Sequence, residues 1–213
     1  VHTDLKEFED AISCYHKAIE IKPNLVGAHN NLGLVFRGLN DFENAINCYQ
    51  KAIEIQPDHA RAHHNLAQAY KELGKFEKAI KSYQMVLKYE PDNLTSYFFL
   101  SELKKDVLDA YLKGKIEKIL TTNQSTKVNA AYGNYLLAKY ERKSKNYEKE
   151  LNYLIKGHLN FFNSNKKQFD FGVKYCFDDA IQIAKKAKLE KLGPKNEKKI
   201  KPIFIIGVPR CGS

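Results

Sequence analysis

A period of 34 residues governs the first part of the chain. Proline returns at that spacing at Pro23, Pro57 and Pro91. Agreement of several columns at one period points to stacked copies of one structural unit, because composition alone does not produce it. Four further columns keep the same spacing: Phe8, Phe42 and Phe76; Ala11, Ala45 and Ala79; Ile12, Ile46 and Ile80; Tyr15, Tyr49 and Tyr83.

Each repeat has the apolar spacing of two helices. Phe42, Ala45 and Tyr49 are separated by three and four residues, which places them on one face of a helix. Leu32 and Gly33 mark the helix before it. The prolines stop the second helix of each unit, since proline cannot continue a helix. The pattern predicts an all-α fold in which small residues lie where two helices approach closely, namely Gly33 and Ala67 in one column and Ala45 and Ala79 in another.

The columns are similar to those of the tetratricopeptide repeat (TPR). The resemblance implies two antiparallel helices per unit, stacked into a superhelical solenoid with a concave groove. Residues 24–57 and 58–91 match two complete units, and residues 1–23 match part of another. We therefore expect repeats over residues 1–93. We also expect a chain that begins inside a repeat, at Val1.

Helical periodicity continues after the regular repeats, but the glycine, alanine and proline columns do not. Residues 94–120 suggest two helices separated near Lys113 and Gly114. Leu137 and Tyr147 recover the spacing of a degenerate unit, and residues 167–189 have the pattern of another amphipathic helix. We therefore expect a TPR-like helical bridge over residues 94–189. A lysine-rich linker should follow over residues 190–202.

The last residues combine a strand pattern with a glycine-containing loop. Ile203 to Ile206 form a short apolar run, which predicts a buried strand. The loop that follows has the composition of a phosphate cradle, because glycine lets backbone N–H groups approach an anion. It lacks the lysine of the nucleoside-triphosphatase loop, and its cation is Arg210, whose guanidinium can bond two oxygens of a phosphate or sulfate at once.

This loop resembles the 5′-phosphosulfate-binding loop of sulfotransferases, approximately G-x-P-[RK]-S-G-[ST]-T after a strand. The chain departs from the pattern at Cys211, which stands where the family has serine. The whole order of segments resembles bacterial TPR sulfotransferases. The resemblance implies that residues 203–213 begin a truncated α/β, P-loop-like sulfotransferase domain. The donor cosubstrate would be 3′-phosphoadenosine-5′-phosphosulfate (PAPS), with no metal and with Arg210 as the catalytic residue. The implied nucleotide-binding residues are Gly207, Pro209, Arg210, Cys211, Gly212 and Ser213.

Two other functions stay open. The chain could be a TPR interaction scaffold without catalysis, or the TPR arm of a glycosyltransferase, although that class does not begin its catalytic domain with such a loop. Asn31 and Asn65 lie 34 residues apart. They resemble the asparagines that hold peptide backbone in the repeats of O-linked N-acetylglucosamine transferase, so we expect a protein or peptide partner in the groove. The alternative is that both asparagines are solvated or cap local backbone.

Charge and composition add weaker limits. The net charge of +10 is uneven: residues 1–93 hold 11 Lys and Arg against 13 Asp and Glu, whereas residues 94–213 hold 24 against 12. The excess fits attraction of an anionic nucleotide, and it fits equally well the solubility of lysine-rich helices. No nucleic-acid module and no membrane-length apolar run is visible. The four cysteines form no metal pattern and no C-x-x-C motif, which fits a reducing compartment, and we expect a cytoplasmic protein. Cys14 and Cys48 occupy one repeat column, where we expect a small buried residue.

Overall fold

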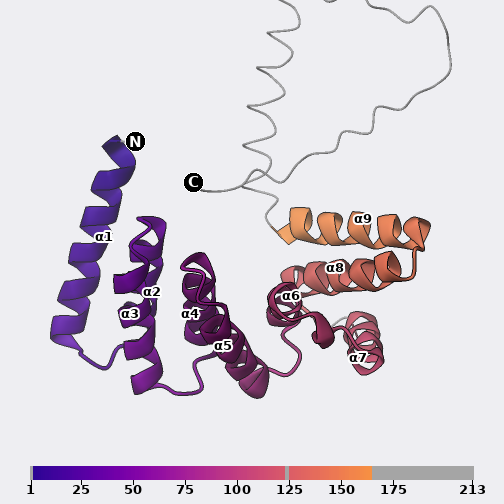
Figure 1. Cartoon of the computed structure of the whole chain (residues 1–213). Helices are drawn as coiled ribbons and strands as arrows, with labels where there is room; N and C mark the ends of the chain where they lie inside the picture. Colours follow the sequence, from indigo (N-terminus) through magenta and orange to yellow (C-terminus); the bar gives the residue numbers. More distant parts are fainter. Residues whose placement is uncertain (1, 123–124, 165–213) are drawn as a thin grey trace, which may run out of the picture. The chain divides into compact units, whose positions relative to one another are not determined.

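The computed structural model describes residues 2–122 and 125–164, and every regular element in these residues is a helix (Figure 1). The chain divides after Phe161 into two compact units, and the helices belong to the first unit except for the last residues of α9. The predictions for residues 167–189, 190–202 and 203–213 lie outside the described residues. The helices are α1 (His2–Ile21), α2 (Val26–Gly38), α3 (Phe42–Ile55), α4 (Ala60–Glu72), α5 (Phe76–Tyr89), α6 (Leu94–Leu103), the 3-10 turn η1 (Lys105–Val107), α7 (Ala110–Thr121), α8 (Lys127–Lys143) and α9 (Tyr147–Ser164).

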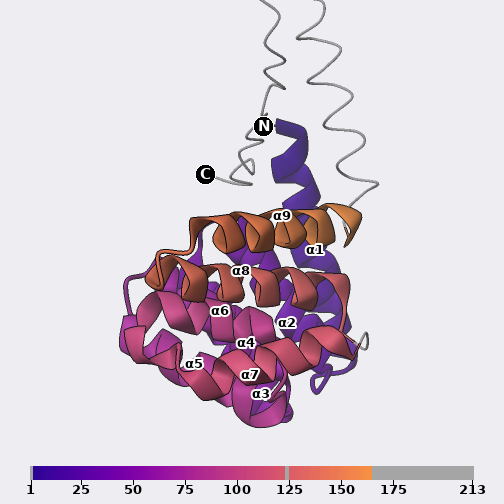
Figure 2. The ribbon, with the colours of Figure 1, turned by 90° about the vertical axis from the view of Figure 1, so that its right-hand side faces the viewer.

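The repeats form stacked helix pairs. Helix α2 packs on α3 and α4 packs on α5, and each pair contacts the next through the α3–α4 and α5–α6 interfaces. After α6 the order changes, because α8 packs against both α6 and α7 (Figure 2). The predicted all-α TPR-like solenoid is confirmed for the described part of the chain.

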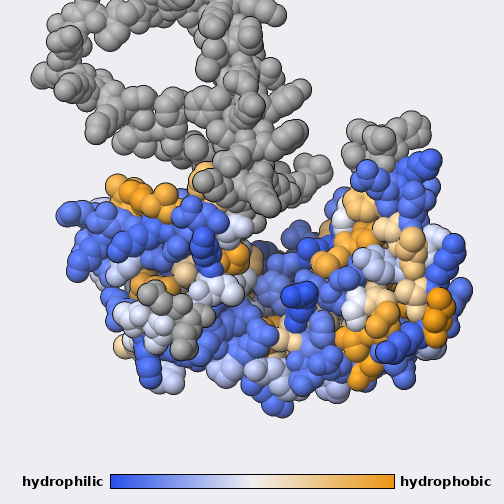
Figure 3. Space-filling model, turned by 180° about the vertical axis from the view of Figure 1, so that it is seen from behind, coloured by the Kyte–Doolittle hydropathy of each residue, from blue (hydrophilic) through white to orange (hydrophobic). Residues whose placement is uncertain are grey.

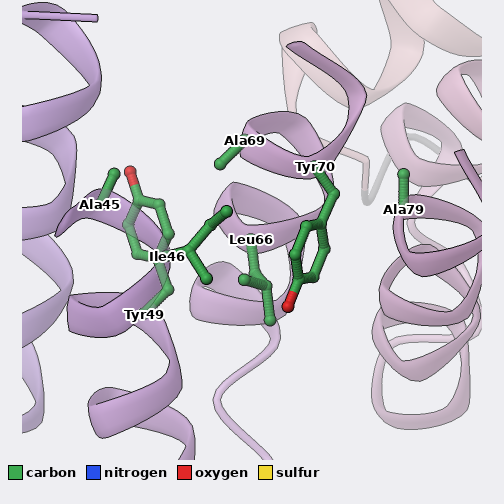
Figure 4. Packing of buried hydrophobic residues seen from close by; sticks show 7 residues of the cluster. All are labelled: Ala45, Ile46, Tyr49, Leu66, Ala69, Tyr70 and Ala79. Atoms are coloured by element: carbon green, nitrogen blue, oxygen red, sulfur yellow. The ribbon is translucent and has the colours of Figure 1, made fainter. Parts of the chain in front are cut away.

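Small residues at the predicted columns let the helices approach. Ala45 and Ala79 are fully buried, as is the ring of Tyr49 beside Ala45 (Figure 4). A Cβ atom at Gly33 would lie 2.5 Å from Cε1 of Tyr49, closer than carbon atoms pack. Gly33 therefore lets the Tyr49 ring lie closer to α2 than a side chain there would allow, whereas Ala67 takes the equivalent position beside Tyr83.

The irregular part begins and ends its helices at different residues from those predicted. The expected break near Lys113 and Gly114 is wrong, since α7 runs through both, and the interruption lies between Leu103 and Ala110. The reason is a helix cap, because the Asp109 side chain accepts a hydrogen bond from the Leu112 amide at 2.7 Å. The exposed Gly114 is tolerated inside the helix.

Two smaller expectations fail at the start of the chain. We expected residues 1–23 to contain the end of a first helix and its partner, but α1 runs unbroken from His2 to Ile21. We also expected the column of Cys14 and Cys48 to hold a small buried residue, but Cys14 is exposed and Cys48 half-buried. The third member of the column, Ser82, is buried, so the depth of this column differs from one repeat to the next.

Helix α9 exposes a stripe of large apolar side chains. Leu151, Ile155 and Leu159 follow one another at a spacing of four residues, and each is about half exposed or more. Figure 3 shows apolar residues gathered along this edge of the described helices, and a second group of apolar residues on the opposite side of the view. In the described residues, no helix combines the length and apolar character needed to cross a bilayer.

Candidate functional site

The candidate site is a surface formed by the first helix of each pair, α2, α4, α6 and α8. We call it the first-helix face. Contacts among its side chains connect the four helices in series. Its members are Asn30, Asn31, Arg37, His64, Asn65, Gln68, Lys71, Phe98, Phe99, Tyr132, Tyr135 and Lys139.

The two predicted asparagines are connected through a third. The Asn65 amide donates to Oδ1 of Asn30 at 2.9 Å, and the Asn30 amide donates to Oδ1 of Asn31 at 3.2 Å. Asn65 is buried and Asn31 is half-buried. The structure thus places both residues on the expected helices, joined by hydrogen bonds between α2 and α4. Their role in holding a peptide backbone stays a prediction.

A second chain of hydrogen bonds runs across α2, α4 and α6. The Arg37 guanidinium donates to Oε1 of Gln68, so the Gln68 amide nitrogen is the group that faces Nε2 of His64, at 3.0 Å. Nε2 must therefore accept, and the ring proton lies on Nδ1, which donates to Oγ of Ser96 at 3.2 Å. These four side chains form a relay with a fixed direction, which we call the Arg37–Ser96 relay.

The relay holds His64 in its neutral form. Burial, and to a smaller extent the positive charge of Arg37, lower the pKa of His64 to about 4. The ring also contacts Tyr83 and Phe99 edge-on, at centroid distances of 5.5 and 5.8 Å. A neutral imidazole with both nitrogens engaged serves here as a fixed polar support.

Four aromatic rings cover α6 and α8. Phe98 lies 5.2 Å from Tyr132 and 6.0 Å from Tyr135 between ring centroids, and Phe99 lies 5.6 Å from Tyr132. All four rings are half-buried, so each keeps an accessible part. The Tyr135 ring also packs against α9, where Gly157 has no side chain to collide with it. We call these four residues the aromatic cluster.

Two lysines flank the aromatic cluster. Nζ of Lys139 lies 4.0 Å above the ring centroid of Phe98 and donates to Oγ of Ser101 at 2.9 Å. Nζ of Lys71 lies 5.1 Å from the ring centroid of Phe99 and forms an ion pair with Glu102 at 3.2 Å. Cations over aromatic faces are favourable contacts, and they set positive charge beside accessible apolar surface.

Sequence reasoning missed the aromatic cluster and the relay. The sequence did offer a hint of these side chains. Asn30, His64 and Phe98 stand at the 34-residue spacing, one residue before the Asn31 and Asn65 column, and each can form side-chain contacts between helices. Phe99 stands 34 residues after Asn65, in the third position of the asparagine column, where it cannot provide the hydrogen bonds of an amide. In the structure Phe99 adds an aromatic contact between α6 and α5, since its ring stacks on Tyr83 at a centroid distance of 6.0 Å.

The predicted nucleotide-binding loop cannot be placed on this frame. Gly207, Pro209, Arg210, Cys211, Gly212 and Ser213 all lie outside the described residues. Their predicted roles therefore rest on the sequence.

Comparison with known families decides the nature of the repeats. One TPR repeat model matches residues 1–39 and 33–74, and a tetratricopeptide repeat model matches residues 60–93. Residues 1–93 are tetratricopeptide repeats. The matched columns include the buried alanines that bring the helix pairs together.

Solved TPR structures share the fold. Two crystal structures of MamA align with TM-scores of 0.53 and 0.51 at 17% and 16% identity. The first alignment covers 77% of this chain and 94% of that protein, and the second covers 78% and 88%. The first TPR of Spaghetti (RPAP3), solved with an HSP90 peptide, aligns at a TM-score of 0.46 and 23% identity over 51% of this chain and 86% of that one, which is too distant to carry an argument. No protein with a curated description matches the sequence.

Proposed function

We propose that the first-helix face binds an extended segment of another protein, and that the chain acts as a protein-interaction scaffold. The observation that carries the proposal is the aromatic cluster. Four large rings contact one another on α6 and α8 and keep accessible surface. Aromatic side chains of this kind are favoured where a protein meets a partner, because they bury much area at little conformational cost.

The relay and the asparagine contacts support the same proposal. They fix side chains of α2, α4 and α6 before any partner arrives, so little side-chain entropy is lost on binding. A preformed face that spans several repeats suits a ligand that runs along the stack.

Selection from a phage-displayed library of random peptides tests the proposal. Peptides should be enriched on the wild-type protein, and the double variant Tyr132→Ser, Tyr135→Ser should lose their binding. The matched control is Tyr111→Ser, Tyr147→Ser, which removes two exposed tyrosines from α7 and α9, away from the face. Circular dichroism checks that both variants keep their helices. Absence of enriched peptides, or equal binding by the two double variants, would contradict the proposal.

We also propose a PAPS-dependent sulfotransferase activity for the protein that contains this sequence. Its support is the run from Gly207 to Ser213, which has the spacing of the phosphosulfate loop and a cation at Arg210. Arg210 would stabilise the charge that develops on the oxygens of the transferred sulfuryl group.

Calorimetric titration with adenosine 3′,5′-bisphosphate, the product nucleotide, tests this second proposal. The protein should bind that nucleotide, and Arg210→Ala should weaken binding. Lys201→Ala is the control, since it removes a cation just before the strand pattern. Binding of a nucleoside triphosphate in place of the bisphosphate would overturn the sulfotransferase proposal and leave the interaction proposal intact.

A further inference from the structure

We infer that the segment bound by the first-helix face is acidic, and that it carries an aromatic or large aliphatic side chain next to a carboxylate. This inference rests on the proposed peptide-binding function. It goes further, because it assigns a chemical class to the partner from the charges and rings that the face presents.

Two cations of the face have no carboxylate partner. Arg37 bonds the neutral amide of Gln68, and Lys139 bonds the neutral hydroxyl of Ser101. In residues 2–122 and 125–164, neither takes part in an ion pair. A charge held by neutral groups gains from an anion supplied by a ligand.

The neighbouring charges are already matched, apart from one exposed acid. Lys71 pairs with Glu102 at 3.2 Å, and Arg142 pairs with Glu150 at 2.6 Å. Glu72 of α4 is exposed and forms no ion pair in the described part of the chain. Within the residues that the structure describes, the face therefore carries two unpaired positive charges, Arg37 and Lys139, of which Lys139 lies at the aromatic cluster, against one unpaired acid, Glu72.

The charged form of Lys139 is destabilised by its surroundings. Burial lowers the pKa of its ammonium group; Glu102 opposes this, while the positive charges of Lys71 and Arg142 act in the same direction as burial. A ligand carboxylate beside Nζ would relieve that destabilisation of the charged form. Lys139 is thus the group of the face with most to gain from an acidic partner.

The aromatic cluster fixes what must lie beside the carboxylate. Nζ of Lys139 is above the Phe98 ring, and that ring contacts both Tyr132 and Tyr135. A carboxylate bound at Lys139 would bring the adjacent side chain of an extended segment onto these rings. An apolar side chain of the ligand at this position buries apolar surface of the aromatic cluster, whereas a polar side chain leaves part of the rings exposed to water.

Fluorescence anisotropy with four short labelled peptides tests the inference. Each has Gly-Ser flanks and an amidated end, so that every negative charge is on a side chain. One alternates Asp with Phe, one replaces Asp by the isosteric Asn, one replaces Phe by Ala, and one replaces Asp by Lys. We expect the Asp–Phe peptide to bind about tenfold more tightly than the Asn–Phe or Asp–Ala peptide, the scale of one charge-assisted hydrogen bond. The Lys–Phe peptide should bind least.

Two charge-removing variants locate the effect. Lys139→Met keeps the apolar stem and removes the charge, so it should abolish the preference for Asp–Phe over Asn–Phe. Arg37→Met should reduce that preference. Lys118→Met is the matched control, because Lys118 is an exposed lysine of α7 away from the face, and it should leave the preference unchanged. Melting curves of the three variants show whether each is folded.

The outcomes separate the inference from the function on which it rests. Equal binding of Asp–Phe and Asn–Phe peptides, with loss of both in Tyr132→Ser, Tyr135→Ser, would overturn the acidic partner and keep the peptide-binding face. A preference for Asp–Phe that survives in Lys139→Met would also overturn the inference. Failure of all four peptides, together with a library that yields no binder, would overturn both.

Discussion

Two buried hydroxyl groups have no hydrogen-bond partner. Tyr49 and Tyr83 occupy the same column of successive repeats, both are fully buried, and neither hydroxyl finds a donor or acceptor in the described structure. Burial raises the pKa of Tyr49 to about 12. A desolvated hydroxyl without a partner costs stability, while the ring that carries it fills the space between helices.

Removal of that hydroxyl should stabilise the protein. We expect Tyr49→Phe to raise the free energy of unfolding by about 1 kcal/mol, because the ring remains and the unsatisfied oxygen is lost. Urea denaturation followed by circular dichroism measures the change. Tyr70→Phe is the control, since the Tyr70 hydroxyl accepts a hydrogen bond from Gln50 at 3.3 Å and its loss brings no such gain. A lower midpoint for Tyr49→Phe would mean that its oxygen is satisfied.

At the scale of elements, the sequence predicted the helices of the repeats well and those of the bridge less well. Within the repeats, proline and the small-residue columns mark both ends of a helix and its packing face, so α2 to α5 follow from the 34-residue period. In the bridge those marks are absent. The start of α7 combines the local cap at Asp109 with a tertiary contact, in which the Tyr140 hydroxyl donates to the Asp109 carbonyl at 2.7 Å, and this second contact is not visible in local sequence.

The neutral His64 gives the stack a dependence on pH. Its pKa in the folded protein is about 4, below its ordinary value of 6.5, so between these values the unfolded chain binds a proton that the folded chain does not. The free energy of unfolding is therefore constant above about pH 6.5 with respect to this group. It should fall by ~3 kcal/mol as the pH drops to about 4. Denaturation in urea at a series of pH values measures this slope.

His64→Gln identifies the source of the slope. The variant lacks the titrating ring, so its stability should change less between pH 6.5 and 4 than that of the wild type, whatever its stability at neutral pH. Burial also lowers the pKa of His59, and His59→Gln is the comparison for the remaining histidines. Parallel stability curves for wild type and His64→Gln would show that His64 is protonated without loss of the fold.

At the scale of the molecule, a small cluster joins two larger cores. Ala67, Tyr83 and Leu100 pack together between the core of α3, α4 and α5 and the core of α6, α7 and α8. The half-buried Leu103 packs against the first core and Val107 against the second, and both also touch the small cluster. Stability in a stack of this kind is carried by contacts between neighbours, so the small cluster should couple the two cores.

Leu100→Ala tests that coupling. The variant should lose roughly 2–4 kcal/mol, and amide hydrogen exchange should speed up on both sides of the junction, in α4 and α5 as well as in α6 to α8. Leu112→Ala removes the same atoms inside the second core and should affect α6 to α9 alone. If Leu100→Ala also leaves exchange in α4 and α5 unchanged, the two cores are independent.

The candidate site was less predictable than the fold because it depends on which repeat contacts which. The repeat columns give the position of Asn31 and Asn65 on their helices, and this much was predicted. That Lys139 lies over Phe98 follows from the packing of α8 on α6, across an insertion that shifts the repeat spacing. The 34-residue period predicts where a residue lies within its repeat. Since the period stops before α8, the sequence does not predict which residues of α8 face α6.

The direction of the Arg37–Ser96 relay has a consequence for the history of the chain. Residue 68 must accept from a guanidinium with one atom and donate to an imidazole with another, and the primary amide of Gln68 supplies an acceptor oxygen and a donor nitrogen for these two bonds. A glutamate there would have no donor for His64, and a change of Arg37 alone would leave the Gln68 oxygen without its cation. Replacements at positions 37, 64 and 68 should therefore appear together in descendants of a common ancestor rather than one at a time. In an alignment of close homologues these three columns should change jointly, while the exposed columns of α3 and α5 change independently.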